Sequence, residues 1–242
     1  MNRALIIILG LFLFGVVSNQ AVDKIKTSNG ELAIYPVKHG TVVFQWQGET
    51  IFVDPVGGAA LYKKFGNPTM VLVTDIHGDH FHKDTLDAVV KEKTVMITPE
   101  TVAALISGKI KESITTLANG KSFDKAGIKI EAIPMYNLTA SRLRFHNKGR
   151  GNGYVITFGD KRVYVSGDTE DIPEMRALKK IDIAFVCMNL PYTMTPEQAA
   201  DAVREFKPKI VYPYHYRGSD TAKFKELVGS ISEVRLRDWY IK

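Results

Sequence analysis

The chain has 242 residues, 45% of them apolar, which is enough to bury the core of one folded domain and excludes a disordered or low-complexity protein. Its formal net charge of +6 is spread along the chain, and no basic stretch interleaved with aromatic residues indicates nucleic-acid binding. The single cysteine, Cys187, lies in an apolar run and excludes an intrachain disulfide.

Residues 1–21 have the features of a secretory signal peptide. Met1–Arg3 is positive, Ala4–Val17 contains no charge, and Ser18–Ala21 supplies small residues near a cleavage point. The apolar stretch of about 14 residues is short of the roughly 20 that a membrane-spanning helix needs, and an uncleaved anchor is the alternative. We therefore expect residues 22–242 to form one exported domain, periplasmic or secreted, without a stable membrane span. It could be a monomer or a homo-oligomer.

The rest of the chain alternates predicted strands with predicted amphipathic helices, without a short repeat or a linker. Two tight turns, at Gln47-Gly48 and Gly159-Asp160, indicate β-hairpins. Threonine followed by proline, at Thr98-Pro99 and Thr195-Pro196, predicts two helix starts in which threonine is the cap. The expected strands are 34–37, 42–46, 50–53, 154–158 and 162–166, and the expected helices are 84–92, 99–107, 196–206 and 221–228.

The densest group of chemically active residues follows the apolar run Val71–Val73. Two acids and three imidazoles crowd into the next few positions, and burying them together is unfavourable unless a divalent cation compensates. Asp75 and His77 are two apart and can face one ion, whereas Asp79 and His80 can face a second. One loop does not complete two metal sites, so further ligands must come from elsewhere.

Three downstream residues, His146, Asp168 and His215, fit that requirement. Each lies at one end of an apolar β-type segment, where α/β sheets collect ligand groups. Taken alone, each residue has an ordinary alternative role. His146 could be a surface imidazole in a basic loop, Asp168 an acid in a turn, and His215 a buried core histidine. Together with the loop they favour metal binding. His82 is more typical of a helix start, and His39 of a residue that orients the site.

These residues resemble the signature of the metallo-β-lactamase superfamily of metal-dependent hydrolases, an H-x-H-x-D-H loop followed by separated His, Asp and His ligands. The segments H-G-x-V, V-D-P, G-x-G-Y-V-I, S-G-D-T, Y-T-M-T-P-E-Q-A-A and P-Y-H-Y look closest to the branch of the L-ascorbate-6-phosphate lactonases. The likeness runs from about Leu32 to Trp239. It implies an α/β fold with two sheets flanked by helices, a four-layer αββα sandwich.

The resemblance also implies two divalent metal ions. One would be held by Asp75, His77 and His146, the other by Asp79, His80 and His215, with Asp168 as the bridge. The family motif has His where this chain has Asp75, which adds a hard oxygen ligand and removes an imidazole. We expect this substitution to weaken the preference for zinc at the first site or to leave that site partly empty. Zinc still ranks first and manganese second.

Two ions about 4 Å apart would hold a bridging hydroxide that attacks near neutral pH, so no Ser or Cys nucleophile is required. Asp168 would fix the ions and Asp79 would orient the hydroxide. Candidate substrate contacts are Asn137, Arg144 and Tyr192, with loop packing as the alternative. The sequence predicts an exported hydrolase that opens a lactone or ester, or cleaves a phosphodiester, in a small-molecule or lipid-derived substrate. The alternatives are an N-acyl-phospholipid-type phosphodiesterase and a non-catalytic envelope protein that binds metal or a ligand.

Overall fold

Two β-sheets form the centre of the protein. The structure, a computed structural model, describes residues 22–240, so the predicted signal peptide at 1–21 lies outside the described part. In each sheet the order of the strands follows their order in the chain. The first sheet contains β1 (Asp23–Thr27), β2 (Gly30–Lys38), β3 (Thr41–Trp46), β4 (Glu49–Val53), β5 (Met70–Leu72), β6 (Val95–Thr98) and β7 (Ile114–Thr116). The second contains β8 (Ser122–Lys125), β9 (Ile128–Met135), β10 (Gly151–Phe158), β11 (Lys161–Val165), β12 (Ile183–Cys187), β13 (Ile210–Tyr214) and β14 (Glu233–Val234).

The two sheets follow the same plan. Strands β1 to β4 and β8 to β11 pair antiparallel, and each set continues in parallel strands, β4 to β7 and β11 to β14. Parallel neighbours need crossover connections, and these contain most of the helices. The helices are α1 (Lys83–Val89), α2 (Glu100–Ala103), α3 (Pro173–Arg176), α4 (Pro196–Phe206) and α5 (Thr221–Val228), with 3₁₀ turns at Ala59–Phe65, Lys109–Ser113 and Ala140–Arg142. Among residues 22–240, no helix has the length and apolar character needed to cross a membrane.

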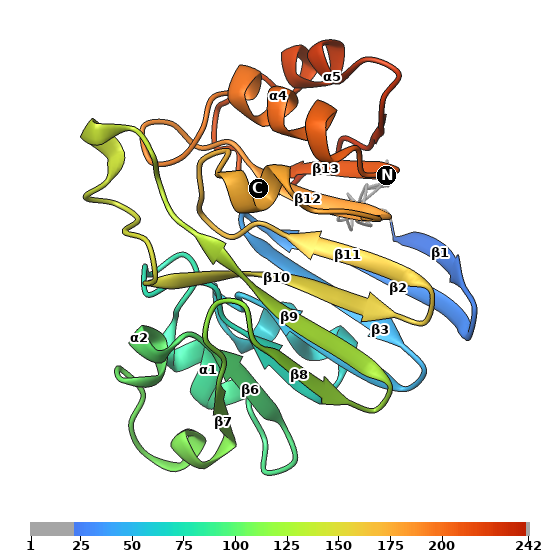
Figure 1. Cartoon of the computed structure of the whole chain (residues 1–242). Coiled ribbons are helices and arrows are strands. Elements are labelled where there is room, and N and C mark those ends of the chain that lie inside the picture. The colour runs from blue at the N-terminus through green and yellow to red at the C-terminus, as the bar shows by residue number, and fades with distance from the viewer. Residues whose placement is uncertain (1–21, 241–242) are drawn as a thin grey trace, which may run out of the picture.

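The sheets pack face to face, and the helices lie outside them. Figure 1 shows α4 and α5 on one side of the sandwich and α1 and α2 on the opposite side. Phe44 of the first sheet contacts Phe158 and Phe185 of the second, with ring centroids 5.6 and 5.7 Å apart. Its neighbour Val43 faces the other way, into a second core cluster that includes Leu86 of α1. The central strands are therefore buried on both faces, which explains their unbroken apolar runs. The predicted αββα sandwich is confirmed.

Most of the local predictions are confirmed. The turns at 47–48 and 159–160 join β3 to β4 and β10 to β11 as hairpins. Thr195 caps α4 through a capping box, in which its hydroxyl accepts from the backbone of Gln198 while the Gln198 side chain accepts from the Thr195 N–H.

The helix predicted at Thr98-Pro99 differs from the observed one. Thr98 is the last residue of β6 and lies opposite Thr116 of β7, so its backbone belongs to the sheet rather than to a cap. Pro99 takes the cap position and makes no side-chain hydrogen bond. The prediction of a threonine cap is therefore wrong here. The helix also ends earlier than predicted, at Ala103, and Ile106 beyond it packs into the core.

Candidate metal centre

The seven predicted ligands come together at one end of the sandwich. The loop that carries Asp75–His80 follows β5, Asp168 follows β11, and His215 follows β13, while His146 lies in the loop that leads into β10. Ends of neighbouring strands meet at one sheet edge, so residues far apart in the chain become neighbours. Three groups result, each with ligand atoms within 4.8 Å of one another: Asp75, His77 and His146; His80, Asp168 and His215; and His39, Asp79 and His215.

Asp168 lies between the histidines of the two predicted sites. Its Oδ2 is 3.4 Å from Nε2 of both His146 and His80, and its Oδ1 is 3.2 Å from Nδ1 of His215. Gly167 before it has a φ of 61°, and a Cβ there would lie 2.5 Å from the sulfur of Met135. The glycine thus lets the chain present Asp168 to both sides, which is the position that a bridging ligand requires.

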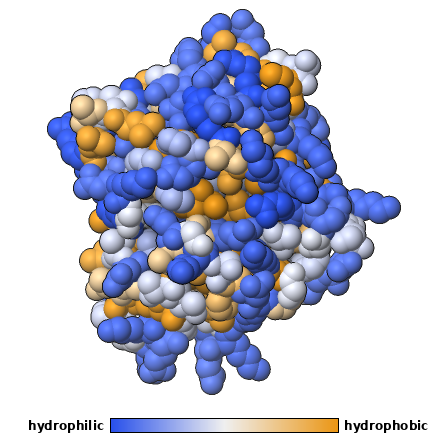
Figure 2. Space-filling model, in the orientation of Figure 1, coloured by the Kyte–Doolittle hydropathy of each residue, from blue (hydrophilic) through white to orange (hydrophobic). Residues whose placement is uncertain are grey.

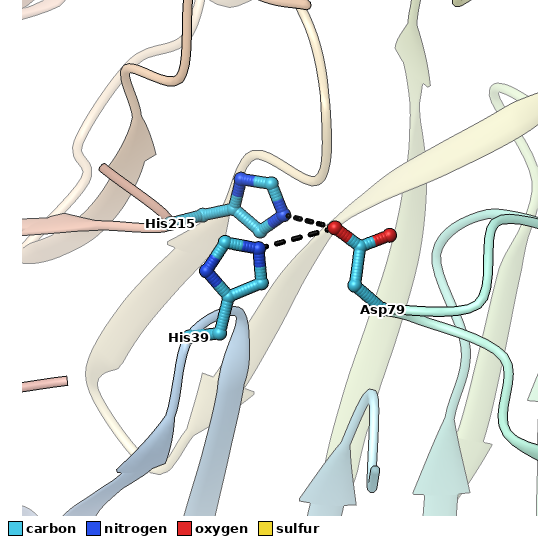
Figure 3. A group of neighbouring side chains, drawn as sticks. All are labelled: His39, Asp79 and His215. Atoms are coloured by element: carbon cyan, nitrogen blue, oxygen red, sulfur yellow. Dashed lines mark hydrogen bonds and ion pairs between the residues drawn. The ribbon is translucent and has the colours of Figure 1, made fainter. Parts of the chain in front are cut away.

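Asp79 is held by two histidines, as Figure 3 shows. Its Oδ2 lies 3.1 Å from Nε2 of His39 and 3.3 Å from Nε2 of His215. The two rings lie side by side, with centroids 3.7 Å apart. Nδ1 of His39 is 2.6 Å from the hydroxyl of Tyr240, so Tyr240 in the C-terminal segment fixes the imidazole ring that orients Asp79. His82 lies outside the centre and caps the start of α1.

Buried polar atoms without hydrogen bonds gather in this centre. Within the described part of the chain they include His80 Nε2, His146 Nε2, Asp168 Oδ1 and both ring nitrogens of His215. Each such atom costs roughly 1–3 kcal/mol when it stays unpaired. Imidazole nitrogens and carboxylate oxygens are the ligands of zinc and related divalent cations. The residues present therefore fit a bound divalent cation.

Asp54 fixes the orientation of His80, a role that the sequence analysis missed. Its Oδ2 lies 2.7 Å from Nδ1 of His80, and its carboxylate accepts hydrogen bonds from N and Oγ1 of Thr74 at 2.8 and 2.6 Å. His146 is held in the same way, with Nδ1 3.2 Å from the carbonyl oxygen of Tyr192. Holding Nδ1 directs Nε2 at the centre, as in other metal sites. The V-D-P segment was the signal that could have identified Asp54.

The acids of the centre are ionised. Burial favours neutral Asp168, but the neighbouring His215 and His80 hold its pKa well below the usual range. Partial burial likewise favours neutral Asp79, and the imidazoles of His215 and His39 beside its Oδ2 lower its pKa far below the usual range. Burial opposes protonation of His80, yet the charges of Asp168 and Asp54 raise its pKa well above normal. This excess of negative charge favours a bound cation.

The turn between β2 and β3 joins the two sheets at the centre. A Cβ on Gly40 would lie 2.9 Å from Cδ2 of His215 and 3.5 Å from Cε1 of His80, so the H-G-x-V segment needs its glycine. His39, Asp54 and His215 have left-handed φ values of 52°, 47° and 46°. Such conformations are costly for residues other than glycine and are typical of functional sites.

Asp75 has a partner that the sequence analysis did not identify. Nε of Arg150 lies 3.0 Å from its Oδ1, and Nη2 lies 2.9 Å from its Oδ2. Nδ1 of His77 is 2.7 Å from the same Oδ2. Burial raises the pKa of Asp75, but the hydrogen bond from His77 and nearby positive charges, including Arg150, lower it to about 2. Both carboxylate oxygens are therefore already engaged.

A cavity of about 250 Å³ opens over the centre. Phe145 and Tyr192 form an aromatic wall, with their rings edge to face and centroids 4.9 Å apart. Asn189 and Arg217, which the sequence analysis did not single out, complete the lining above the ligands. Arg217 makes no ion pair with any residue of the described part.

Of the three predicted substrate contacts, Tyr192 lines this cavity and the other two do not. Asn137 is buried behind the wall, where its Nδ2 donates to the carbonyl oxygen of Tyr192 at 2.7 Å. Arg144 lies over the ring of Phe145, with its Cζ 4.7 Å from the centroid, and is exposed. Both support the aromatic wall, which was the packing alternative.

Comparisons with known proteins agree with this geometry. The sequence matches the family model described as Beta-lactamase superfamily domain over residues 33–215. A UPF0173 metal-dependent hydrolase of Lysinibacillus sphaericus is 30% identical over 212 residues, covering 82% of this chain and 92% of that protein. A crystal structure from Parabacteroides distasonis, described as a candidate metal-dependent hydrolase, shares 41% identity with a TM-score of 0.83, covering 90% of this chain and 98% of that one. A metallo hydrolase of the archaeon Ignicoccus hospitalis shares the fold, at 21% identity and a TM-score of 0.70, covering 85% and 94% of the two chains.

Proposed function

This chain belongs to the beta-lactamase superfamily, in the UPF0173 family of metal-dependent hydrolases, and on that premise we propose that it hydrolyses a lactone, an ester or a phosphodiester. The proposal places it near the branch of L-ascorbate-6-phosphate lactonases, on the sequence segments shared with that branch. It also includes export directed by residues 1–21, and zinc as the preferred metal with manganese second.

One observation carries the proposal. The unpaired buried nitrogens of His80, His146 and His215 and the unpaired Oδ1 of Asp168 converge under the cavity. Protein interiors pair such atoms unless a ligand does so. A site whose ligands face a cavity leaves room for substrate, whereas a purely structural metal site is closed.

The proposed ligands are Asp75, His77, Asp79, His80, His146, Asp168 and His215. Divalent ions bound there would supply a hydroxide nucleophile near neutral pH and polarise the oxygen of the scissile group. Asp168 keeps the two groups of histidines at a fixed separation. Asp79, ionised and held by His39, accepts a hydrogen bond from the attacking water and so orients it.

The cavity lining favours a small anionic substrate. Arg217 supplies a guanidinium that can pair with a carboxylate or phosphate. Phe145 and Tyr192 supply a flat apolar wall suited to a ring. A lactone or cyclic ester that bears an anionic group would use both features.

The test is a panel of lactones, carboxyl esters and phosphodiesters, each in an anionic and a neutral form, with zinc-loaded and manganese-loaded protein. We expect turnover of an anionic member, a loss of at least about 100-fold in His80→Ala, and a loss of the preference for anionic substrates in Arg217→Gln. Stoichiometric metal binding without turnover of any member would instead favour the non-catalytic alternative.

A second candidate substrate class is lipid-derived. The large apolar side chains Leu138, Leu143, Leu190 and Tyr192 are 41–49% exposed, and Tyr192 is part of the cavity wall. Figure 2 shows apolar side chains gathered over the loop between β9 and β10, where two of these leucines lie. Exposed apolar patches of this kind mark interaction surfaces. Faster hydrolysis of an N-acylated phospholipid in vesicles than of a soluble diester would select this class.

A further inference from the structure

The two halves of the metal centre are not equivalent, because among the residues that the structure describes an arginine pairs with a proposed ligand only at Asp75. Asp75 is completely buried, and Arg150, 15% exposed, binds it through two parallel hydrogen bonds of 3.0 and 2.9 Å. A bidentate pair of this geometry is the strongest that arginine forms with a carboxylate. The negative charge of Asp75 is therefore already compensated.

Arg150 cannot easily move away from Asp75. Its Nη2 also donates to the carbonyl oxygen of Phe145, and its own carbonyl oxygen accepts from Oγ1 of Thr101 at 2.6 Å. The next residue, Gly151, has no room for a side chain, since a Cβ would lie 2.8 Å from the carbonyl oxygen of Thr74, the neighbour of Asp75. The guanidinium is thus a fixed part of the centre.

In the described part of the chain, no lysine or arginine pairs with the proposed ligands of the other half. His80, Asp168 and His215 have ligand atoms within 4.8 Å of one another, and several of these atoms make no hydrogen bond in the described part. Asp79 lies beside them with its Oδ2 3.3 Å from Nε2 of His215. A metal ion here would satisfy atoms that make no hydrogen bond, including Oδ1 of Asp168. At the other group Nε2 of His146 is also without a hydrogen bond, but an ion there would have to share both oxygens of Asp75 with Arg150 and His77.

We propose that Arg150 takes the place of metal charge at Asp75, so that the chain binds one divalent cation tightly at His80, Asp168 and His215 and a second one weakly at Asp75, His77 and His146. A fixed positive charge next to a shared carboxylate repels an incoming cation, and the buried surroundings screen this repulsion poorly. The inference rests on the proposed function only in requiring that a divalent cation binds.

Metal-free protein titrated with zinc, by calorimetry and by elemental analysis after gel filtration, tests this directly. The wild type should take up one ion tightly and a second at least about tenfold more weakly. In Arg150→Met, which keeps the side-chain length and removes the charge, the second ion should bind about 10–100-fold more tightly. The matched control is Arg144→Met, because Arg144 lies outside over Phe145 and has no contact with Asp75.

Arg150→Met could also loosen the loop, so a second variant tests the inference independently. Asp75→Asn keeps the hydrogen-bonding shape, and the tight ion should keep its affinity within about threefold. Loss of the tight ion in this variant, or two ions of equal affinity in the wild type, would overturn the inference. An unchanged second ion in a folded Arg150→Met protein would also overturn it. Failure of the wild type to bind any zinc would refute the proposed metal-dependent function itself.

Discussion

Individual residues in the centre are held by partners that do not themselves face the cavity. Asp54 lies behind His80, a backbone carbonyl lies behind His146, and His39 lies behind Asp79. Such partners fix the ring orientation and the free nitrogen of each ligand. The affinity for metal is therefore expected to depend on residues outside the ligand set.

Asp54→Asn tests this dependence. The amide keeps the size of the carboxylate but removes the charge that lies 2.7 Å from Nδ1 of His80. We expect zinc to bind about 10–100-fold more weakly, measured by competition with a chromophoric chelator. Asp87→Asn, on the exposed face of α1, is the control and should leave the affinity unchanged. An unchanged affinity in Asp54→Asn would show that His80 does not need this partner.

At the scale of elements, the loop between β9 and β10 is held by one buried acid. Oε2 of Glu170 accepts hydrogen bonds from the backbone N–H of Leu138 and of Thr139, both at 2.6 Å, and Oε1 accepts from Arg142 at 2.6 Å. This loop carries His146 and Phe145, one of the two residues of the aromatic wall. The S-G-D-T-E sequence thus supplies Asp168 to the centre and Glu170 to the loop opposite it.

Glu170→Gln should loosen the loop. We expect the free energy of unfolding to fall by about 2 kcal/mol at neutral pH, because hydrogen bonds to a charged group are lost. Burial favours neutral Glu170, but its backbone and Arg142 partners lower its pKa below the usual 4.5. Its contribution is therefore present above about pH 4.5 and is lost as the pH falls through the lowered value. Denaturant titrations at pH 7 and pH 3.5 should show the difference between variant and wild type shrinking in acid.

Glu226→Gln is the matched control, since Glu226 is exposed and, within residues 22–240, forms an ion pair only with Lys223 on the surface of α5. Its free energy of unfolding should equal that of the wild type at both pH values. A difference between Glu170→Gln and wild type that stays constant with pH would contradict the role given to the Glu170 charge.

For the whole molecule, the centre is where the two sheets depend on each other. Ligands come from the ends of strands in both sheets, and the backbone N–H of His215 donates to the carbonyl oxygen of His39 at 3.1 Å. A cation bound there would link both halves of the sandwich. Metal binding should therefore stabilise the entire fold rather than one loop.

Zinc in about 100-fold excess over its dissociation constant should add about 2.7 kcal/mol to the free energy of unfolding. For a chain of this size that corresponds to a rise of about 5–10 °C in Tm, which a chelator should reverse. In His215→Ala, zinc should no longer raise the Tm. His82→Ala removes an imidazole at the start of α1 and should keep the rise. Equal Tm values with and without zinc in the wild type would contradict a metal that links the sheets.

Local residue patterns determined much of this protein. Alternating apolar segments predicted strands and helices, and the family resemblance implied their arrangement as an αββα sandwich. Gln47-Gly48 predicted a hairpin, and Thr195-Pro196 predicted a capped helix. The D-x-H-x-D-H loop and the three later strand-end residues were found from residue type and position alone, and the structure brings them together. These features depend on neighbours in the chain or on a general rule about strand ends, so they can be read from sequence.

Only the tertiary structure decided which partner each ligand has. Arg150 and Asp75 are 75 positions apart, and several other arginines have equal chemistry, so nothing local pairs these two. Thr98 is a second example. The local sequence predicted a helix cap there, but Thr98 pairs with Thr116 in the sheet. Side-chain pairing across the sandwich follows from strand register and close packing, which emerge only when both sheets are assembled. The sequence thus determined which residues could bind a metal ion, and the fold decided which partner each of them has.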